Sequence, residues 1–429
     1  MPQGPSLIFD KSSLESLNIH EAALMDNFYM STITPLFFVE CLADLEKHMR
    51  SGSTPEQLVG SLADRTPDSQ GYPNVHHTAI LNGELTRQFD LKTVYERVAM
   101  AHGEPVQLGD KKGIVYRKSK EQEALERWTR REFLEVERTI AKDWRKALIA
   151  VDFNAMVNHA MGGLGPWRKP KTLEDAKQIA DTIIDYVDPE WLLRFGLDLL
   201  GLPDAIGVPN AADVVIADWT QQRRPPLRDY VPYFIFMLTI NIFFCLVLPT
   251  RLLKNVKASH QVDLAYLYYL PFCSVFTSKD NFHADIVPLF LNSRQTFVNG
   301  HDFKEDLKKL DAHYSALPDE VLASGLINFA ATPPDDRSFL ITQLWDKYLP
   351  RWREIKARPK HPRDPEADKK LIEEINTMTD SPDLRPHDES DMEKINYVTI
   401  IKSVKLRKGK WRRFSEESEK KMRDAGELH

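Results

Sequence analysis

An almost unbroken apolar run from Tyr230 to Pro249, within "DYVPYFIFMLTINIFFCLVLPTRLLKN", constrains this chain more than any other segment. The run is long enough to cross a bilayer and basic residues follow it, which is typical of a transmembrane helix. It also contains Pro232, Thr239 and Asn241, and the chain has no second run of this kind. Because a helix buried in a protein core is also apolar all round, we predict a core helix at 230–249 packed on a sheet. A membrane-attached protein is the alternative.

The composition is that of an ordinary folded protein of two or three domains. The chain has 429 residues and a net charge of −6. This charge does not attract nucleic acid or anionic lipid, so either partner needs a local basic patch. Cys41, Cys245 and Cys273 lie in apolar sequence without metal-like spacing, which indicates core residues in a reducing compartment. Because "MPQGPSLIFDKSS" does not have the pattern of a secretory signal, we expect a cytoplasmic protein.

Strands and helices alternate at two places in the chain. "SLIFDKSS" predicts a strand ending at Asp10, residues 14–27 have helical periodicity, and "FYMSTIT" predicts a second strand followed by a helix from Pro35. After the apolar run, a helix is predicted over about 262–270, then a strand over 273–277 and another helix. This alternation predicts an α/β fold with a mainly parallel sheet.

The remaining segments are mostly helical or polar. We predict a mainly helical insertion at 51–227, which includes one long charged helix over 118–150. Residues 301–355 are predicted to form C-terminal helices. They are followed by a charged, proline-rich linker at 356–395 and a flexible basic tail at 396–429.

Four carboxylates lie in strongly apolar sequence next to these elements. Asp10 and Asp280 each follow a strand, Glu40 lies on the helix after the second strand, and Asp263 is near the start of a helix. Asp280 also suits a helix cap. Acidic side chains are rarely placed in apolar elements unless they are paired or bind a metal. A hard cation such as Mg²⁺ or Mn²⁺ would offset the repulsion between several carboxylates, so the four are candidate metal ligands and catalytic residues.

Three motifs give the chain a resemblance to the PIN-like nuclease domain family. They are "LIFDKSS", "YMSTITPLFFVECLADL" and "VDLAYLYYLPFCSVFTSKDNFH". In order and position they resemble the family's acidic motifs. By this resemblance the four acids of the family correspond to Asp10, Glu40, Asp263 and Asp280, and Ser12 and Ser278 are neighbouring polar groups. The resemblance covers about residues 1–50 and 228–300 and implies a discontinuous three-layer core. The long insertion between the second and third acids departs from compact family members. A membrane crossing at 230–249 would separate the first two acids from the last two.

The resemblance implies a metal-dependent endoribonuclease that hydrolyses phosphodiester bonds, most commonly of single-stranded RNA, with Mg²⁺ or Mn²⁺ activating a water. Candidate substrate-binding residues are Ser12, Lys11, Ser278, Lys279 and His283, with Arg130, Arg131 and the tail at 405–413 as further cations. Each of these cations is as readily explained as a solvated surface charge. A non-catalytic binding or scaffold protein of the same fold is the main alternative, and a homo-oligomer is left open.

Other site classes have little support. His76 and His77 have no Cys or His partner at a zinc-like spacing. The Gly-rich stretch at 159–169 lacks the Gly-Lys-Ser/Thr of a phosphate-binding loop, and no Gly-x-Ser-x-Gly elbow occurs. A hydrolase with a nucleophilic side chain is therefore not expected.

Overall fold

The computed structural model describes residues 4–49, 52–67, 75–87, 103–108, 111–116, 120–149, 157–158, 162–163, 167–200, 211–250, 252–253, 260–357, 385–386 and 406–424. The predicted linker at 356–395 falls almost entirely outside these ranges, as does Lys405 of the tail.

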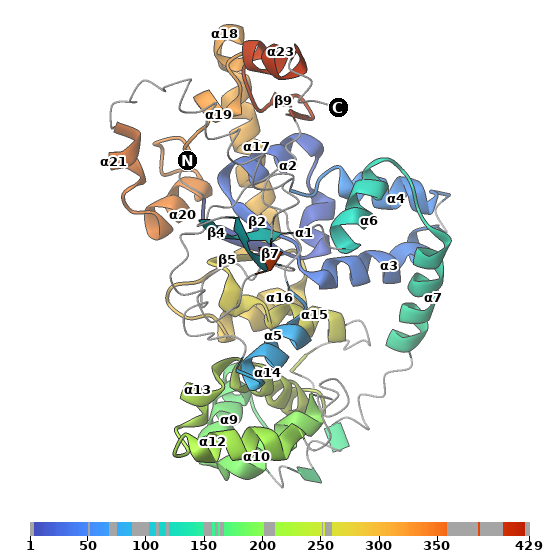
Figure 1. Ribbon diagram of the computed structural model, residues 1–429, viewed down its shortest axis with the longest axis vertical. Helices are drawn as coiled ribbons and strands as arrows, with labels where there is room; N and C mark the ends of the chain where they lie inside the picture. Colours follow the sequence, from blue (N-terminus) through green and yellow to red (C-terminus); the bar gives the residue numbers. More distant parts are fainter. Residues whose placement is uncertain are drawn as a thin grey trace.

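A four-stranded, all-parallel sheet lies near the middle of the molecule (Figure 1). In spatial order its strands are β2 (Met30–Thr32), β1 (Ser6–Phe9), β5 (Val275–Ser278) and β6 (Thr296–Asn299). All three neighbouring pairs are parallel. The predicted α/β class is confirmed, and β1, β2 and β5 lie in predicted strands. β6 lies where no strand is predicted, because it is a short edge strand with only one buried residue and so has a weak apolar signal.

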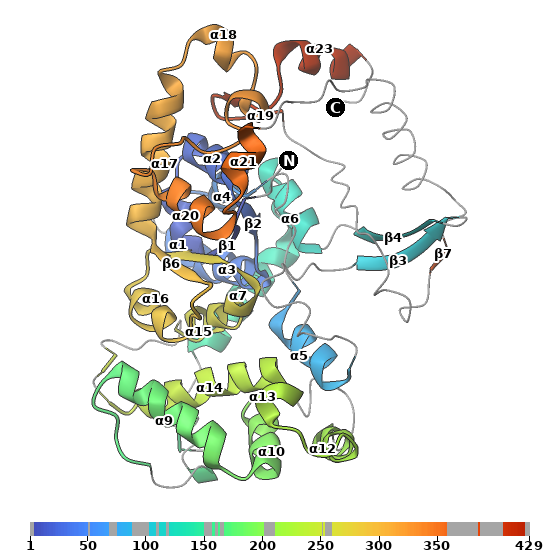
Figure 2. The same ribbon diagram turned by 90° about the vertical axis from the view of Figure 1, so that its left-hand side faces the viewer.

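Helices from every part of the chain lie around this sheet or in a group beyond it, and the helices of residues 173–247 form that group (Figures 1 and 2). The N-terminal helices are α1 (Lys11–Ser16), α2 (Ile19–Phe28), α3 (Pro35–Met49), α4 (Pro55–Ala63), α5 (His77–Leu85), α6 (Lys120–Thr129) and α7 (Glu135–Ile149). The middle helices are α9 (Leu173–Tyr186), α10 (Pro189–Leu199), α12 (Ala211–Gln221), α13 (Leu227–Tyr230), α14 (Pro232–Val247), α15 (His260–Leu267) and α16 (Asn281–Ile286), with 3-10 helices η2 (Leu270–Phe272) and η3 (Val287–Leu289). The C-terminal helices are α17 (Gly300–Ser315), α18 (Asp319–Leu322), α19 (Leu326–Phe329), α20 (Leu340–Tyr348), α21 (Trp352–Ala357) and α23 (Glu416–Asp424).

Both faces of the sheet are buried. In β1, Leu7 and Phe9 belong to the core shared with α2, α17 and α20, whereas Ile8 belongs to the core that contains α14 and α15. β5 follows the same alternation, since Phe276 pairs with Ile8 and lies in the same core. A parallel sheet covered on both faces buries every residue of its inner strands, and all four residues of "SLIF" and of "VFTS" are buried.

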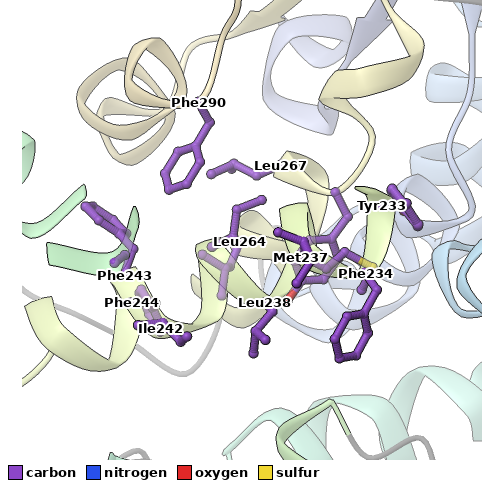
Figure 3. Close-up of a cluster of buried hydrophobic side chains, with 14 of the residues drawn as sticks. Tyr233, Phe234, Met237, Leu238, Ile242, Phe243, Phe244, Leu264, Leu267 and Phe290 are labelled. Atoms are coloured by element: carbon purple, nitrogen blue, oxygen red, sulfur yellow. The ribbon is translucent and has the colours of Figure 1, made fainter. Parts of the chain in front are cut away.

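The apolar run forms α14, which lies at the centre of the larger core (Figure 3). Thirteen of its sixteen residues are buried, so the predicted core helix is confirmed. Its rings contact residues that follow β5: Phe243 lies 5.3 Å from Phe290, and Phe244 lies 6.2 Å from Phe282, between ring centroids. Within the described ranges, no helix combines the length and apolar character that a membrane crossing requires.

The position of α14 corrects one expectation. It was expected to pack on the sheet, but α15 and α16 lie between it and the strands in both views (Figures 1 and 2). The opposite side of α14 packs on α9. Because α9 covers that side, the helix is apolar all round rather than along one stripe.

The single long helix predicted at 118–150 is two helices, α6 and α7, with a sharp turn between them. Arg131 adopts a left-handed backbone conformation with φ +64, and its guanidinium binds Asp64 (Nη2–Oδ2 2.6 Å). Buried Glu137 accepts hydrogen bonds from the side chains of Arg127 and Trp128 across the turn. The turn is thus fixed by long-range and cross-turn contacts, and no Gly or Pro marks it in the sequence.

The insertion also contains β-structure that is not predicted. β3 (Gly103–Leu108) and β4 (Lys111–Tyr116) form an antiparallel hairpin, and β7 (Arg385–Pro386) pairs with β3. The pairing brings a segment of the C-terminal region to the insertion.

Part of the basic tail is folded, contrary to the expectation of a flexible tail. β8 (Arg407–Lys408) and β9 (Trp411–Arg412) form a short hairpin before α23. Trp411 is 5% exposed, and its indole N–H donates to Asp311 (3.0 Å). Lys410 also binds Asp311, and Arg413 binds Asp26. These cations therefore attach the tail to the body of the protein.

Helix α14 begins without a cap of its own, and a distant carboxylate supplies one. The residue before the helix, Val231, offers no side-chain hydrogen bond. Instead, buried Glu84 on α5 accepts the main-chain N–H groups of Tyr233 (2.9 Å) and Phe234 (2.7 Å). Burial raises the pKa of Glu84 to about 7, although both hydrogen bonds and Arg87 oppose the shift. The folded protein therefore holds a proton that the unfolded chain releases at lower pH.

This proton makes the free energy of unfolding depend on pH. The stability from protonated Glu84 is fully present below its unfolded pKa of about 4.5 and is lost as pH rises through about 7. We expect Glu84→Gln to reduce the difference in unfolding free energy between pH 5 and pH 8 by roughly 2–3 kcal/mol, measured by urea denaturation. Glu123→Gln, which changes an exposed carboxylate on α6, is the control. A pH dependence equal to wild type in Glu84→Gln would contradict this account.

Candidate carboxylate site

Asp10 and Asp280 lie at the same edge of the sheet. Asp10 directly follows β1 and Asp280 lies two residues past β5, and the two strands are parallel with Phe9 opposite Thr277. Each also caps a helix: Asp10 accepts the N–H of Ser13 (2.9 Å), and Asp280 accepts that of Phe282 (2.8 Å). The cap function expected of Asp280 is therefore present, and it fixes the carboxylate at the carboxyl ends of the strands, where α/β proteins bind ligands.

Glu40 and Asp263 approach this edge from two helices that contact each other, α3 and α15. Glu40 accepts hydrogen bonds from the main-chain N–H of Lys11 (3.3 Å) and from the Tyr266 hydroxyl (2.9 Å). Tyr266 lies one helical turn from Asp263 on α15. The main-chain oxygen of Asp263 bonds the ring of His283 (2.8 Å), which attaches α15 to α16.

Asp10 is the most extensively hydrogen-bonded of the four acids. It is 3% exposed, and its oxygens accept hydrogen bonds from Ser12 Oγ, Ser13 N and Ser278 Oγ, the last at 2.6 Å. Burial alone raises the pKa of Asp10, but His283 and these hydrogen bonds outweigh it and hold the pKa below its ordinary value. Asp10 is thus a stable carboxylate in the absence of any ligand.

His283 is fully buried, and its hydrogen bonds assign its protonation. Nε2 faces the main-chain oxygen of Asp263, and Nδ1 faces Ser278 Oγ at 2.8 Å. Ser278 gives its own proton to Asp10, so its oxygen must accept from Nδ1. Both ring nitrogens therefore carry protons, and the ring is positively charged. Burial lowers the pKa of His283, but the hydrogen bond and charge of Asp10 raise it to about 9.

Glu40 and Asp263 have the opposite electrostatics. Burial and the charge of Asp10 raise the pKa of Glu40 to about 8, against the effect of Lys11. Burial raises the pKa of Asp263 to about 7, with Asp280 and Asp10 adding to the shift and His283 opposing it. The Asp263 carboxylate has no hydrogen-bond donor or cation paired with it in the described part of the chain. At neutral pH Glu40 keeps its proton and Asp263 is about half protonated, chiefly because burial penalises the charged form, and the neighbouring carboxylates add to this effect.

The donor set has the chemistry of a site for a hard divalent cation. Carboxylate oxygens are the ligands that Mg²⁺ and Mn²⁺ prefer. Burial is the main cause of the raised pKa values of Glu40 and Asp263, and the charges of neighbouring acids add to both shifts. As placed, the described residues include no group of three His, Cys, Asp or Glu side chains that could hold a metal ion. The oxygens of Asp10 instead accept hydrogen bonds from Ser12, Ser13 and Ser278.

The candidate substrate-binding cations are mostly engaged with acids of the protein. Lys11 is 4% exposed, and its Nζ binds Asp44 (2.8 Å) and Glu15 (3.6 Å). Arg130 and Arg131 pair with acids of the insertion, and Lys410 and Arg413 of the tail pair with Asp311 and Asp26. Lys279 is partly exposed, and its main-chain N–H donates to Ser12 Oγ (3.1 Å). Of these cations, Lys279 is the one that lies beside the acids without a paired carboxylate among the described residues.

Three predicted polar residues have roles within the site. Ser12 and Ser278 both donate hydrogen bonds to Asp10, and the ring of His283 donates one to Ser278 Oγ. His283 is buried, so it does not have the surface needed to contact a phosphate. Tyr266, which orients Glu40, is not predicted from the sequence. Its spacing of three residues from Asp263, on the same face of a helix, is the signal that could have identified it.

Comparisons with protein-family models, with curated proteins and with solved structures found no match.

Proposed function

We propose that this protein is a metal-dependent hydrolase of phosphodiester bonds, with single-stranded RNA as its substrate. The observation that carries the proposal is the gathering of four acids at one edge of the sheet: Asp10 and Asp280 follow neighbouring parallel strands, and Glu40 and Asp263 lie on two helices that contact each other. The raised pKa values of Glu40, about 8, and Asp263, about 7, agree with it. A protein that gathers buried carboxylates at the carboxyl end of a sheet lowers its own stability, which points to a ligand that compensates the charge.

A PIN-like arrangement of the core is part of this proposal. The four acids occur on a strand end, a helix after the second strand, the first turn of a helix and a Ser-x-Asp turn after a strand. This is the order that the resemblance implies. The all-parallel sheet built from residues 6–9, 30–32, 275–278 and 296–299 supports it, since the acids then share one edge.

In this proposal Asp10, Glu40, Asp263 and Asp280 hold Mg²⁺ or Mn²⁺. When bound, the cation lowers the pKa of a water and neutralises charge on the phosphate. His283 and Ser278 hold Asp10 in place, and Tyr266 holds Glu40. Glu40 and Asp263 release their protons as a cation binds, so metal affinity should rise with pH. Lys279, at the rim, supplies a positive charge for the substrate phosphate.

A non-catalytic binding module is the second candidate, and one observation favours it. Both oxygens of Asp10 are already bonded within the protein, and the His283 imidazolium lies 3.5 Å away. The protein thus supplies its own positive charge to the site, which reduces the need for a metal.

One experiment separates the two candidates. Purified protein is incubated with a labelled single-stranded RNA with Mn²⁺, with Mg²⁺ or with EDTA, and its melting temperature is measured in each condition. We expect cleavage only with metal, and a melting temperature that rises with Mn²⁺, more at pH 8 than at pH 6. Neither cleavage nor a metal-dependent shift at either pH would leave the binding module as the better account.

A further inference from the structure

A cavity of about 290 Å³ lies along the first half of α14. Its lining comes from α9, from α13, from α14 between Pro232 and Thr239, and from the residues around η3 that end at Asn292. None of these residues belongs to the carboxylate site. The volume is just below the usual range of drug-sized sites, so the cavity suits a ligand smaller than a typical drug.

One part of the lining is apolar and aromatic. Ile235 and Phe290 are buried, and the ring of Phe236 stands edge-on to that of Phe290, with 6.4 Å between their centroids. Phe290 also packs edge-on against Phe243 in the core (Figure 3), at 5.3 Å. Because this part of the lining is continuous with the core, its shape is fixed before any ligand binds. It suits the apolar group of a ligand.

Charged side chains of both signs lie in the lining as well. Asp181 is between two cations: Lys177 Nζ is 2.6 Å from its Oδ2, and Arg228 Nη2 is 3.5 Å from its Oδ1. Arg228 also pairs with Asp185, which is outside the lining, through Nε (2.8 Å). The two cations and the two carboxylates balance, so these four side chains together carry no net charge. They present a carboxylate next to N–H donors.

These charged groups keep capacity for a ligand although they are paired. The side chains of Lys177, Asp181 and Arg228 are 21%, 36% and 46% exposed. A carboxylate accepts about four hydrogen bonds, an ammonium donates three and a guanidinium five. In the described ranges, contacts with acids use one donor of Lys177 and two of Arg228. Ion pairs at this exposure contribute little to stability, so a ligand can replace them at small cost.

We propose that this cavity binds a free α-amino acid with an apolar side chain, such as leucine or phenylalanine. The ammonium of the ligand binds Asp181, its carboxylate binds Arg228 and Lys177, and its side chain lies against the aromatic part of the lining. Because the charged groups of the protein already balance, an acid or an amine alone would leave a net charge there, whereas a zwitterion does not. The proposal uses none of the residues of the carboxylate site, so either site can fail without the other.

The test is isothermal titration calorimetry on the full chain at pH 7. The probes are free phenylalanine, leucine and glycine, together with phenylpropionate and phenylethylamine, which each lack one of the two charges. We expect saturable binding of phenylalanine or leucine, and at least about tenfold weaker binding of the other three probes. Binding of phenylpropionate or phenylethylamine as tight as that of the better-bound amino acid would overturn the proposal, and so would saturable binding of neither amino acid.

Three variants test whether the binding occurs in this cavity. Arg228→Gln and Asp181→Asn should each weaken the amino acid at least about tenfold. Arg194→Gln is the matched control and should not, because Arg194 is 47% exposed and pairs with acids on α10 and α12, away from the lining. Asp181→Asn should also bring the affinity for phenylalanine close to that for phenylpropionate, since the ammonium has lost its partner. Thermal unfolding checks the fold of each variant, and Asp181→Asn carries the test if Arg228→Gln is destabilised. Wild-type affinity in either folded variant would overturn the proposal.

Discussion

Asp263→Asn is expected to abolish metal-dependent RNA cleavage and at the same time to stabilise the protein when no metal is present. The change removes a carboxylate that has no described partner and whose pKa burial raises to about 7. Removing a residue that only hydrogen-bonds a metal ligand lowers activity by up to about 100-fold, so removing a ligand itself should lower it by at least about 100-fold. The melting temperature at pH 8 in EDTA should rise, because the variant no longer ionises a buried group.

Asp10→Asn should reduce activity and stability together, unlike Asp263→Asn. If the four acids only repelled one another, removing any one of them would raise the stability of the protein. Asp10 is the exception. Its pKa is lowered, and its charge balances buried His283. Breaking such a pair costs about 3 kcal/mol or more, so this variant should lose both activity and stability. Asp285→Asn, an exposed acid on α16, is the control and should change neither. Cleavage at wild-type rates in Asp263→Asn would mean a contaminant or another active site.

Phe244→Ala is expected to lower the free energy of unfolding by about 3–5 kcal/mol, the usual cost of truncating a buried aromatic ring. Phe244 lies on α14, is fully buried, and packs edge-on against Phe282 at the start of α16. Since domains are stable by only about 5–15 kcal/mol, this one change should remove a large part of the total. Urea denaturation at pH 7 measures the effect.

Tyr186→Ala gives the matched comparison, because it removes an aromatic side chain that is 83% exposed, on α9, which packs against α14. Its effect should stay within about 0.5 kcal/mol. If Phe244→Ala were equally mild, α14 would not be the centre of a close-packed core.

The sequence was most informative where a local pattern determines the structure. β1, β5 and the helix from Pro35 follow from apolar content, turn residues and a proline at a first turn, so Asp10, Glu40 and Asp280 could be placed on a strand end, a helix and a turn. The nature of the apolar run at 230–249 could not be decided by its pattern, since a core helix and a membrane helix look alike. The packing of α9 against one side of α14 decides it.

What the sequence could not show depends on contacts between distant residues. The turn at Arg131 is fixed by Asp64, and the N-terminus of α14 is capped by Glu84. The protonation of His283 follows from Ser278 and Asp263, which approach it from a strand and another helix. None of these contacts produces a local sequence pattern, because each partner is an ordinary polar residue in its own segment.

The central strand has a neighbour that is made very late. β1 lies between β2 and β5, and Ser6 bonds Ser274, which is 268 positions away in the chain. At about 5–20 residues per second, a ribosome releases the second neighbour roughly tens of seconds after the first. Until then an apolar strand edge has no partner, and such edges are prone to aggregation. A nascent chain stalled before Val275 should therefore depend on chaperones, and the sheet of the completed chain should form slowly, because the pairing of β1 with β5 closes a long loop.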